Sequence, residues 1–200
     1  MSASAPTVAA VVLAAGGGRR YGMPKALVEY GGSLLVERAV ATARAICDPV
    51  LVVLGAQAVD VWRQADLDGA TVLANKDWET GMASSLRTGL DGLRGWPGRI
   101  DSALILLVDT PGMTAEALAR MTAHASPSAL AVATYDGVRG HPVLIGREHW
   151  AGVVGTATGD EGARRYLAAH DVEEIDCTGL ADPTDLDVPP DPPGGVASAP

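Results

Sequence analysis

The chain has 200 residues, 48% of them hydrophobic, and a formal net charge of −9, which suits one domain with a sizeable core. The acidic balance excludes broad nucleic-acid binding, which needs a basic surface, but it allows an anionic small molecule in a local basic pocket. No segment approaches the roughly 18 to 20 apolar residues of a membrane span, and no basic region precedes the first apolar run, so neither a membrane anchor nor a signal peptide is expected.

Short apolar runs alternate with helical patterns over residues 8–186, the expected domain, between a flexible leader at 1–7 and a Pro- and Gly-rich disordered tail at 187–200. Strands are predicted at 8–13, 50–54, 71–74, 103–108 and 129–134, with an added strand at 138–145. Helices are predicted at 34–46, 58–65, 84–93 and 115–124, with a late helix at 160–169. The alternation predicts an α/β fold, a Rossmann-like and mostly parallel sheet with helices on both faces.

The first predicted strand leads into residues 13–25, which read Leu-Ala-Ala-Gly-Gly-Gly-Arg-Arg-Tyr-Gly-Met-Pro-Lys and carry three cations and no acid. Glycines let backbone N–H groups approach phosphate oxygens, and the cations neutralise their charge. The dinucleotide fingerprint G-x-G-x-x-G fails because its third glycine falls at Tyr21, and no Gly-Lys-Ser/Thr of a Walker loop exists. The segment is interpreted as a nucleotide loop of another kind, against the alternative of a glycine-rich connection with surface arginines.

Two further polar features follow strands and should meet this loop at one edge of the sheet. Asp109 directly follows a buried strand, where a carboxylate can hold Mg²⁺ together with phosphate oxygens; the alternative is a cap before Pro111. Asn75 follows the third strand and precedes Gly81 and two serines that open a helix. Such a helix start offers N–H and hydroxyl donors to a base or an anion, although plain N-capping by either serine explains the same pattern.

Two weaker segments follow, Arg-Gly-His-Pro-Val at residues 139–143 and Gly-Asp-Glu-Gly-Ala-Arg at 159–164. His141 could touch an acceptor substrate or take part in proton transfer, or it could be a structural histidine. Arg164 and Arg165 are interpreted as solvated helix charges. The two cysteines, Cys47 and Cys177, lack metal-type spacing and are expected to be reduced thiols of a cytoplasmic protein.

Together these segments resemble the molybdenum cofactor nucleotidyltransferases, a group within the wider nucleoside-triphosphate transferase superfamily. The family opening L-A-[AG]-G-x-x-x-R-[MFY]-G-x-x-K matches residues 13–25, and N-x-x-W-x-x-G-M-x-x-S matches 75–85. D-x-P matches 109–111, R-G-[NH]-P-V matches 139–143, and G-D-x-G-A-R matches 159–164. Five motifs in the same order are more specific than any one of them, and the resemblance covers most of residues 8–186.

The resemblance implies that an acceptor phosphate attacks the α-phosphate of a nucleoside triphosphate and that pyrophosphate leaves, chemistry that depends on positioning and charge neutralisation. Arg20, Lys25 and Asp109 would then be catalytic, with Asp109 holding Mg²⁺ and His141 facing the acceptor. The nucleotide-binding residues would be Leu13, Ala14, Ala15, Gly16, Gly17, Gly18, Asn75, Gly81 and Ser85.

With Ala15 the opening reads L-A-A-G, which resembles the cytidylyltransferases, whereas the guanylyltransferases have L-A-G-G. The resemblance therefore implies CTP and not GTP as the substrate. By the same analogy the acceptor would be the molybdenum cofactor pterin phosphate, and a molybdoenzyme or chaperone would receive the product. The family often closes with D-x-D-T-P-E-D-L, but here the register puts Ala181 at the metal aspartate with Asp182 beside it. Either Asp109 holds the metal alone or Asp182 contributes.

Three alternative functions stay open. A nucleotidyltransferase for a sugar phosphate or another phosphorylated metabolite shares the first loop. A nicotinamide-dependent oxidoreductase is disfavoured by the missing third glycine and by Gly55, which stands where that class carries an acid at the end of the second strand. A nucleotide-binding regulator would not need both Lys25 and Asp109.

Overall fold

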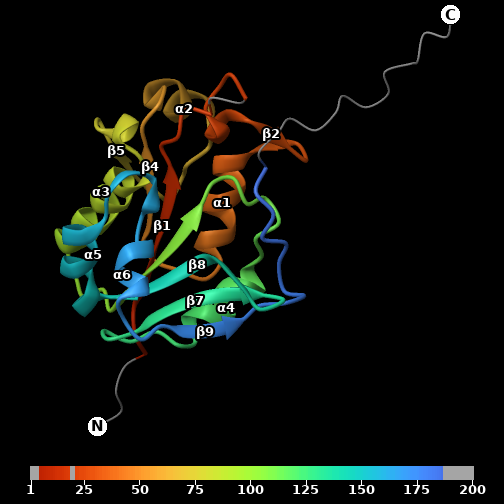
Figure 1. Cartoon of the computed structure of the whole chain (residues 1–200). Helices are drawn as coiled ribbons and strands as arrows, with labels where there is room; N and C mark the ends of the chain where they lie inside the picture. The colour runs from red at the N-terminus through yellow and green to blue at the C-terminus, as the bar shows by residue number, and fades with distance from the viewer. Residues whose placement is uncertain (1–4, 19–20, 187–200) are drawn as a thin grey trace, which may run out of the picture.

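The computed structural model describes residues 5–18 and 21–186, which form one seven-stranded sheet, a two-stranded hairpin and the surrounding helices (Figure 1). The tail predicted at 187–200 and most of the leader predicted at 1–7 lie outside the described residues. The strands are β1 (Val8–Ala14), β2 (Glu29–Tyr30), β3 (Ser33–Leu34), β4 (Val50–Leu54), β5 (Thr71–Ala74), β6 (Ser102–Leu107), β7 (Leu130–Tyr135), β8 (Val138–Gly146) and β9 (Glu173–Asp176). The α-helices are α1 (Leu35–Arg44), α2 (Ala58–Gln64), α3 (Met82–Arg94), α4 (Ala115–Thr122), α5 (Trp150–Thr156) and α6 (Arg164–Ala168). Short 3-10 helices are η1 (Lys25–Leu27), η2 (Trp78–Thr80), η3 (Arg147–His149) and η4 (Gly159–Glu161).

The large sheet has the strand order β5-β4-β1-β6-β8-β7-β9 and is mostly parallel, as predicted. β1 pairs in parallel with both β4 and β6, and β4 pairs in parallel with β5. β8 runs antiparallel to both of its neighbours, β6 and β7, whereas β9 is parallel to β7. β1 therefore lies inside the sheet, and its carboxyl end opens between those of β4 and β6.

Helices cover both faces of this sheet, and each face has its own core. Along β1, Ala10 and Val12 pack toward α1, α2 and α4, while Ala9 and Val11 pack toward α3 and α5. All seven residues of β1 and all five of β4 are buried. Burial of both faces explains why these strands are continuously apolar and do not alternate with polar residues.

The added strand predicted at 138–145 is β8, and a tight turn sets its direction. Asp136 and Gly137 have φ angles of 51° and 77°, the left-handed pair that a two-residue hairpin requires. This Asp-Gly pair is the local sequence signal for a hairpin between β7 and β8. The turn reverses the chain, so β8 enters the sheet antiparallel next to β6.

The late helix predicted at 160–169 was wrong in extent, because the chain forms the separate helices η4 and α6 there. Gly162, with φ 55° and ψ −125°, separates them, since no helix continues through that conformation. The sequence pattern also missed α5, the charged edge strand β9, and the two-residue strands β2 and β3.

Two further expectations concern the cysteines and the membrane. Cys47 and Cys177 are both buried and form no disulfide, as expected for free thiols. Burial raises the pKa of Cys47 to about 12, so this thiol stays protonated near neutral pH. Within the described residues, no helix combines the length and the apolar character that crossing a bilayer requires.

Candidate functional site

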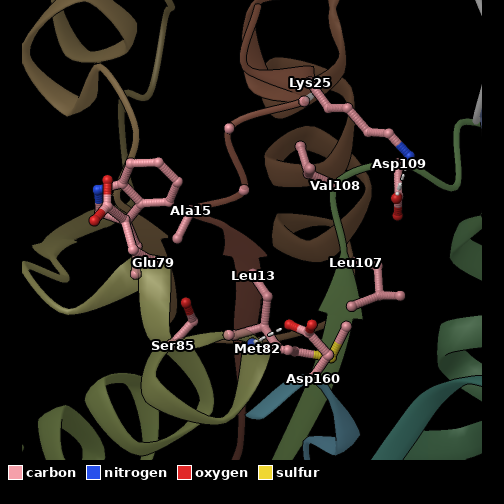
Figure 2. Close-up of a pocket in the computed structure, with 15 residues that line it drawn as sticks. Leu13, Ala15, Lys25, Glu79, Met82, Ser85, Leu107, Val108, Asp109 and Asp160 are labelled. Atoms are coloured by element: carbon pink, nitrogen blue, oxygen red, sulfur yellow. Dashed lines mark hydrogen bonds and ion pairs between the residues drawn. The ribbon is translucent and has the colours of Figure 1, made fainter. Parts of the chain in front are cut away.

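A cavity of about 310 Å³ opens at the carboxyl ends of β1 and β6. Figure 2 shows that its labelled side chains come from the ends of β1 and β6 and the segments after them, from η1, η2 and the start of α3, and from η4. The lining residues are Leu13, Ala15, Gly16, Gly17, Gly18, Lys25, Trp78, Glu79, Gly81, Met82, Ser85, Leu107, Val108, Asp109 and Asp160. The position agrees with the rule that open α/β sheets bind ligands outside the carboxyl ends of their strands.

The glycine loop forms one wall of this cavity, and its shape depends on Gly18. Gly18 has a φ of 58°, and a Cβ there would overlap the carbonyl oxygen of Met23. The Gly18 oxygen accepts hydrogen bonds from the backbone N–H groups of Tyr21 at 2.8 Å and Gly22 at 2.9 Å. A side chain at this position would therefore break the turn that carries the loop back toward Lys25.

The residues of this loop that were predicted to bind nucleotide or to act in catalysis divide into three groups by where they lie. Leu13, Ala15 and the three glycines line the cavity, whereas Ala14 is buried in the core that faces α1. Arg20, predicted as a catalytic cation, lies outside the described residues. Among the described residues that line the cavity, Lys25 is the sole cation.

Lys25 and Asp109 form an ion pair at the rim of the cavity, with 2.8 Å between Nζ and Oδ2 (Figure 2). Their side chains are 17% and 22% exposed, so both charged groups are partly buried and still accessible to a ligand in the cavity. The Val108 N–H donates to the Leu13 oxygen at 3.2 Å, which ties the ends of β6 and β1 together. A cation and a carboxylate from distant parts of the chain are thus held side by side.

Asn75 lies behind the cavity wall and does not line the cavity. It is buried, and its Nδ2 donates to Ser84 Oγ at 2.8 Å and to Ser85 Oγ at 3.0 Å. The Ser84 hydroxyl in turn donates to the Gly81 oxygen at 2.8 Å. Ser85 does line the cavity and accepts from Asn75, so its own proton is available to a ligand. Asn75 is thus placed as a positioning residue for Ser85.

Gly81 joins the start of α3 to a distant loop. It has a φ of 107°, and a Cβ there would lie 2.5 Å from the Gly159 oxygen and 2.7 Å from Asp160 Oδ1. The Asp160 carboxylate accepts from the Met82 N–H at 3.2 Å, at the first residue of α3 (Figure 2). The close approach allowed by glycine therefore brings the segment 159–164 to the cavity wall.

His141 lies in a neighbouring cavity of about 290 Å³, which shares Met82 and Asp160 with the first. Burial is the main reason that the pKa of His141 falls to about 4 from the ordinary 6.5. The Asp109 charge raises this pKa, and the Arg164 charge lowers it further. Both charged residues are therefore within electrostatic range of the ring. The predicted contact of His141 with an acceptor stays a prediction.

Asp182 is not among the residues that line the cavity. Its Oδ1 accepts from the Thr184 N–H at 2.9 Å, and hydrogen bonds from Thr184 lower the pKa of this carboxyl. Across the described residues, no three His, Cys, Asp or Glu side chains form a group suited to a metal ion. Asp109 fits a divalent ion that takes its remaining ligands from phosphate oxygens and water, as Mg²⁺ does in nucleotide sites.

Sequence reasoning assigned no role to several residues of the wall: Trp78, Glu79, Met82 and Asp160. The Trp78 ring packs against Gly17 and Gly55, so it supports the loop from behind. Asp160 could have been found from the two glycines at 159 and 162, which signal a tight loop around a carboxylate.

Residues 10–175 match the MobA-like NTP transferase domain. A nicotine blue oxidoreductase from Paenarthrobacter nicotinovorans is 36% identical over 193 residues, 91% of this chain and 93% of the relative. The Rv0371c homologue from Mycobacterium sp. strain JC1 is 32% identical with a TM-score of 0.79 over 90% of each chain. Rv0371c from Mycobacterium tuberculosis H37Rv, solved in complex with manganese, is 27% identical with a TM-score of 0.73 over 91% of this chain and 94% of that one.

The match and the geometry agree on the same elements. The matched range spans the glycine loop, the ion pair, the start of α3 and the cavity that holds His141. The mycobacterial structures share the arrangement of nearly the whole chain at more than a quarter identity. The resemblance recognised from the five motifs is confirmed: the chain belongs to the MobA-like NTP transferase family.

Proposed function

We propose that this protein is a nucleotidyltransferase enzyme that moves CMP from CTP onto a phosphorylated acceptor and releases pyrophosphate. The observation that carries the proposal is the Lys25–Asp109 pair, 2.8 Å apart, at the rim of a cavity walled by the glycine loop. A loop cation and a metal-binding carboxylate are the two groups that a triphosphate requires, and a merely structural connection needs neither.

The reaction follows from charge and position. An oxygen of the acceptor phosphate attacks the α-phosphorus of CTP, the bond from that phosphorus to the bridging oxygen breaks, and pyrophosphate carries away the electron pair. The acceptor is already an anion, so no general base is required. Backbone N–H groups at residues 16–18 orient the phosphates, and Lys25 neutralises the charge that grows on the leaving group.

Asp109 would hold a divalent ion, for which we propose Mg²⁺. When bound, such an ion supplies positive charge to the triphosphate and to the departing pyrophosphate. Lys25 would then move between two partners, the Asp109 carboxylate and the phosphates, a shift that a partly exposed lysine can make. The manganese complex of the mycobacterial relative supports a divalent metal in this family.

Ala15 is proposed as the reader of the base. Its side chain lines the cavity, and its carbonyl accepts from the Ala56 N–H at 3.0 Å, so the residue is firmly placed. Ala15→Gly should lower the preference for CTP over GTP, by about tenfold as a ratio of kcat/KM values. Ala56→Gly, a neighbour that does not line the cavity, is the matched control. Equal selectivity in wild type and Ala15→Gly would remove Ala15 from this role.

The low pKa of His141 makes a prediction about pH. With a folded pKa of about 4 against an ordinary 6.5, the unfolded chain binds more protons between these values. His141 therefore costs stability as the pH falls from about 6.5 to 4, and it stays neutral at pH 7. His141→Gln should weaken the dependence of the melting temperature on pH over that range. It should not change the shape of the pH–rate profile near neutrality. A wild-type inflection near pH 6.5 that vanishes in the variant would contradict this.

The proposal is tested by a thermal-shift panel of CTP, GTP, ATP, UTP, NAD and NADP, each with and without Mg²⁺. Ligands that bind the folded state raise its apparent stability by mass action. A shift with CTP and Mg²⁺ and none with the other ligands supports a cytidylyltransferase. Transfer is then measured as pyrophosphate release with phosphorylated acceptors, the molybdenum cofactor pterin phosphate first and sugar phosphates as the alternative class.

A nicotinamide-dependent oxidoreductase is the second candidate, and one observation favours it: the relative that is 36% identical is named an oxidoreductase. Against it, β4 is followed by Gly55, where an added Cβ would lie 2.5 Å from the Trp78 Cβ and 2.7 Å from the Ala15 oxygen. The ribose-binding acid of a dinucleotide fold has no room there. A shift with NAD or NADP and none with any triphosphate would make the oxidoreductase the leading hypothesis.

A further inference from the structure

The second cavity, of about 290 Å³, shares a wall with the nucleotide cavity. Met82 and Asp160 line both, and Asp109 at the rim of the first acts electrostatically on His141 in the second. A ligand in the second cavity would therefore lie beside the phosphates of a nucleotide in the first. The cavity is lined by Met82, Val132, Arg139, Gly140, His141, Val143, Asp160, Glu161, Gly162, Ala163, Arg164, Leu167 and Ala168.

The charges of this cavity leave one cation available. Arg139 Nε donates to Glu174 Oε1 at 2.7 Å, so this guanidinium already has a carboxylate partner. Arg164 is exposed, and in the part of the chain that the structure describes it forms no hydrogen bond or ion pair. Its charge nevertheless lowers the pKa of His141. Arg164 thus places at the cavity a positive charge that forms no ion pair with a carboxylate of the described residues.

The two acids of the cavity keep their charges, but each contacts a group other than Arg164. Asp160 caps the start of α3 through the Met82 N–H, and the Glu161 carboxylate lies 3.9 Å from Arg165 Nε. An anion that enters the cavity therefore finds Arg164 as its free counter-charge. A guanidinium pairs with phosphate through two parallel N–H donors, which fixes orientation as well as charge.

The remaining wall is apolar. Val132 and Val143 are 4% and 6% exposed and come from adjacent strands, β7 and β8, while Leu167 comes from α6. A polyhydroxylated ligand would leave hydroxyl groups unpaired along these side chains, which costs free energy. A compact apolar or aromatic body would instead be stabilised by burial there.

We propose that this second cavity binds the acceptor, and that the acceptor is a phosphate monoester with a compact apolar or aromatic body. Arg164 pairs with its phosphate, and Val132, Val143 and Leu167 contact its body. This proposal rests on the proposed transfer reaction. It gives Arg164 the role of a substrate-binding residue and no longer that of a solvated helix charge.

The test uses phenyl phosphate as the probe, with inorganic phosphate and phenol as its two halves. The full chain is first saturated with Mg²⁺ and the α,β-methylene analogue of CTP, which fills the first cavity and cannot react. Binding is measured by calorimetry in wild type, Arg164→Gln and Arg165→Gln. Arg165, the next residue of α6, does not line the cavity and is the matched control. Leu167→Ala tests the apolar wall separately.

Phenyl phosphate should bind more tightly than either half. Arg164→Gln should weaken this binding on the order of tenfold, because one charge-assisted contact is lost. Arg165→Gln should bind like wild type, and Leu167→Ala should weaken phenyl phosphate but not inorganic phosphate. Equal binding by wild type and Arg164→Gln, equal losses in both arginine variants, or a probe no tighter than its halves would overturn the proposal.

Failure of the transfer reaction can be told apart from failure of this assignment. Binding of the CTP analogue is recorded in the first step, without the probe. If the analogue binds and the Arg164 dependence is absent, the acceptor site is wrong and the nucleotide site stands. If the analogue does not bind but phenyl phosphate still depends on Arg164, the proposed transfer of CMP fails and the anion site stands.

Discussion

Lys25→Ala is expected to lower the rate of CMP transfer by about 10²- to 10³-fold, because in the proposed reaction Lys25 is the loop cation that neutralises the leaving pyrophosphate. The fold should survive, since Lys25 is an edge residue of the cavity and not part of either core. A partly exposed ion pair contributes about 1 kcal/mol at most, so the melting temperature should fall by less than about 4 °C.

The measurement is steady-state kinetics beside a thermal melt for each variant. The chain has one other lysine, Lys76, which is exposed and does not line the cavity, so Lys76→Ala is the matched control. A large drop in melting temperature with an unchanged rate in Lys25→Ala would show that this lysine serves stability and not transfer.

Asp109→Asn is expected to abolish the response of the enzyme to divalent metal and to lower the rate at least 10²-fold. The substitution keeps the shape of the side chain but removes the charge that both a metal ion and Lys25 require. The backbone oxygen of residue 109 still accepts from the Leu186 N–H, at 2.8 Å in the wild type, so the local fold should be retained. Activity is followed across titrations of Mg²⁺ and Mn²⁺.

Asp182→Asn separates the two metal assignments. Because the Asp182 carboxylate caps the Thr184 N–H and does not line the cavity, this variant should keep the metal dependence of the wild type. A weaker metal response in Asp182→Asn than in wild type would make Asp182 a second ligand of the metal ion. The same magnesium curve for wild type and Asp109→Asn would remove Asp109 from the metal site.

Much of the cavity at the carboxyl ends of β1 and β6 was predictable because its residues follow strands. The glycine loop, Asp109 and the segment that opens α3 each come directly after an apolar run, and parallel strands end at the same edge. Both β4 and β5 have the predicted bounds. β4 is buried and continuously apolar, as a strand covered on both faces should be, whereas β5 is a partly exposed edge strand whose short apolar run was still recognisable.

A motif gives composition and not direction, so it does not say which way each of its polar side chains points. Asn75 and Ser85 belong to one segment, yet Asn75 is buried behind the wall while Ser85 faces the cavity. Asp182 stood near the expected metal position in the sequence, but its carboxylate is used by a neighbouring N–H. Which way a polar side chain points depends on the hydrogen bonds that its surroundings offer, and these are not local in sequence.

The amino-acid sequence by itself determined the fold class, the family and the edge of the sheet at which the first cavity lies, since hydrophobic pattern, glycine spacing and strand ends are local properties of the chain. Only the tertiary structure decided what lies opposite that edge. The antiparallel entry of β8 brings His141 within electrostatic range of Asp109, and the close approach at Gly81 brings Asp160 to α3. The second cavity is lined by segments far apart in the chain, from Met82 to Ala168, so its existence depends on how these segments pack.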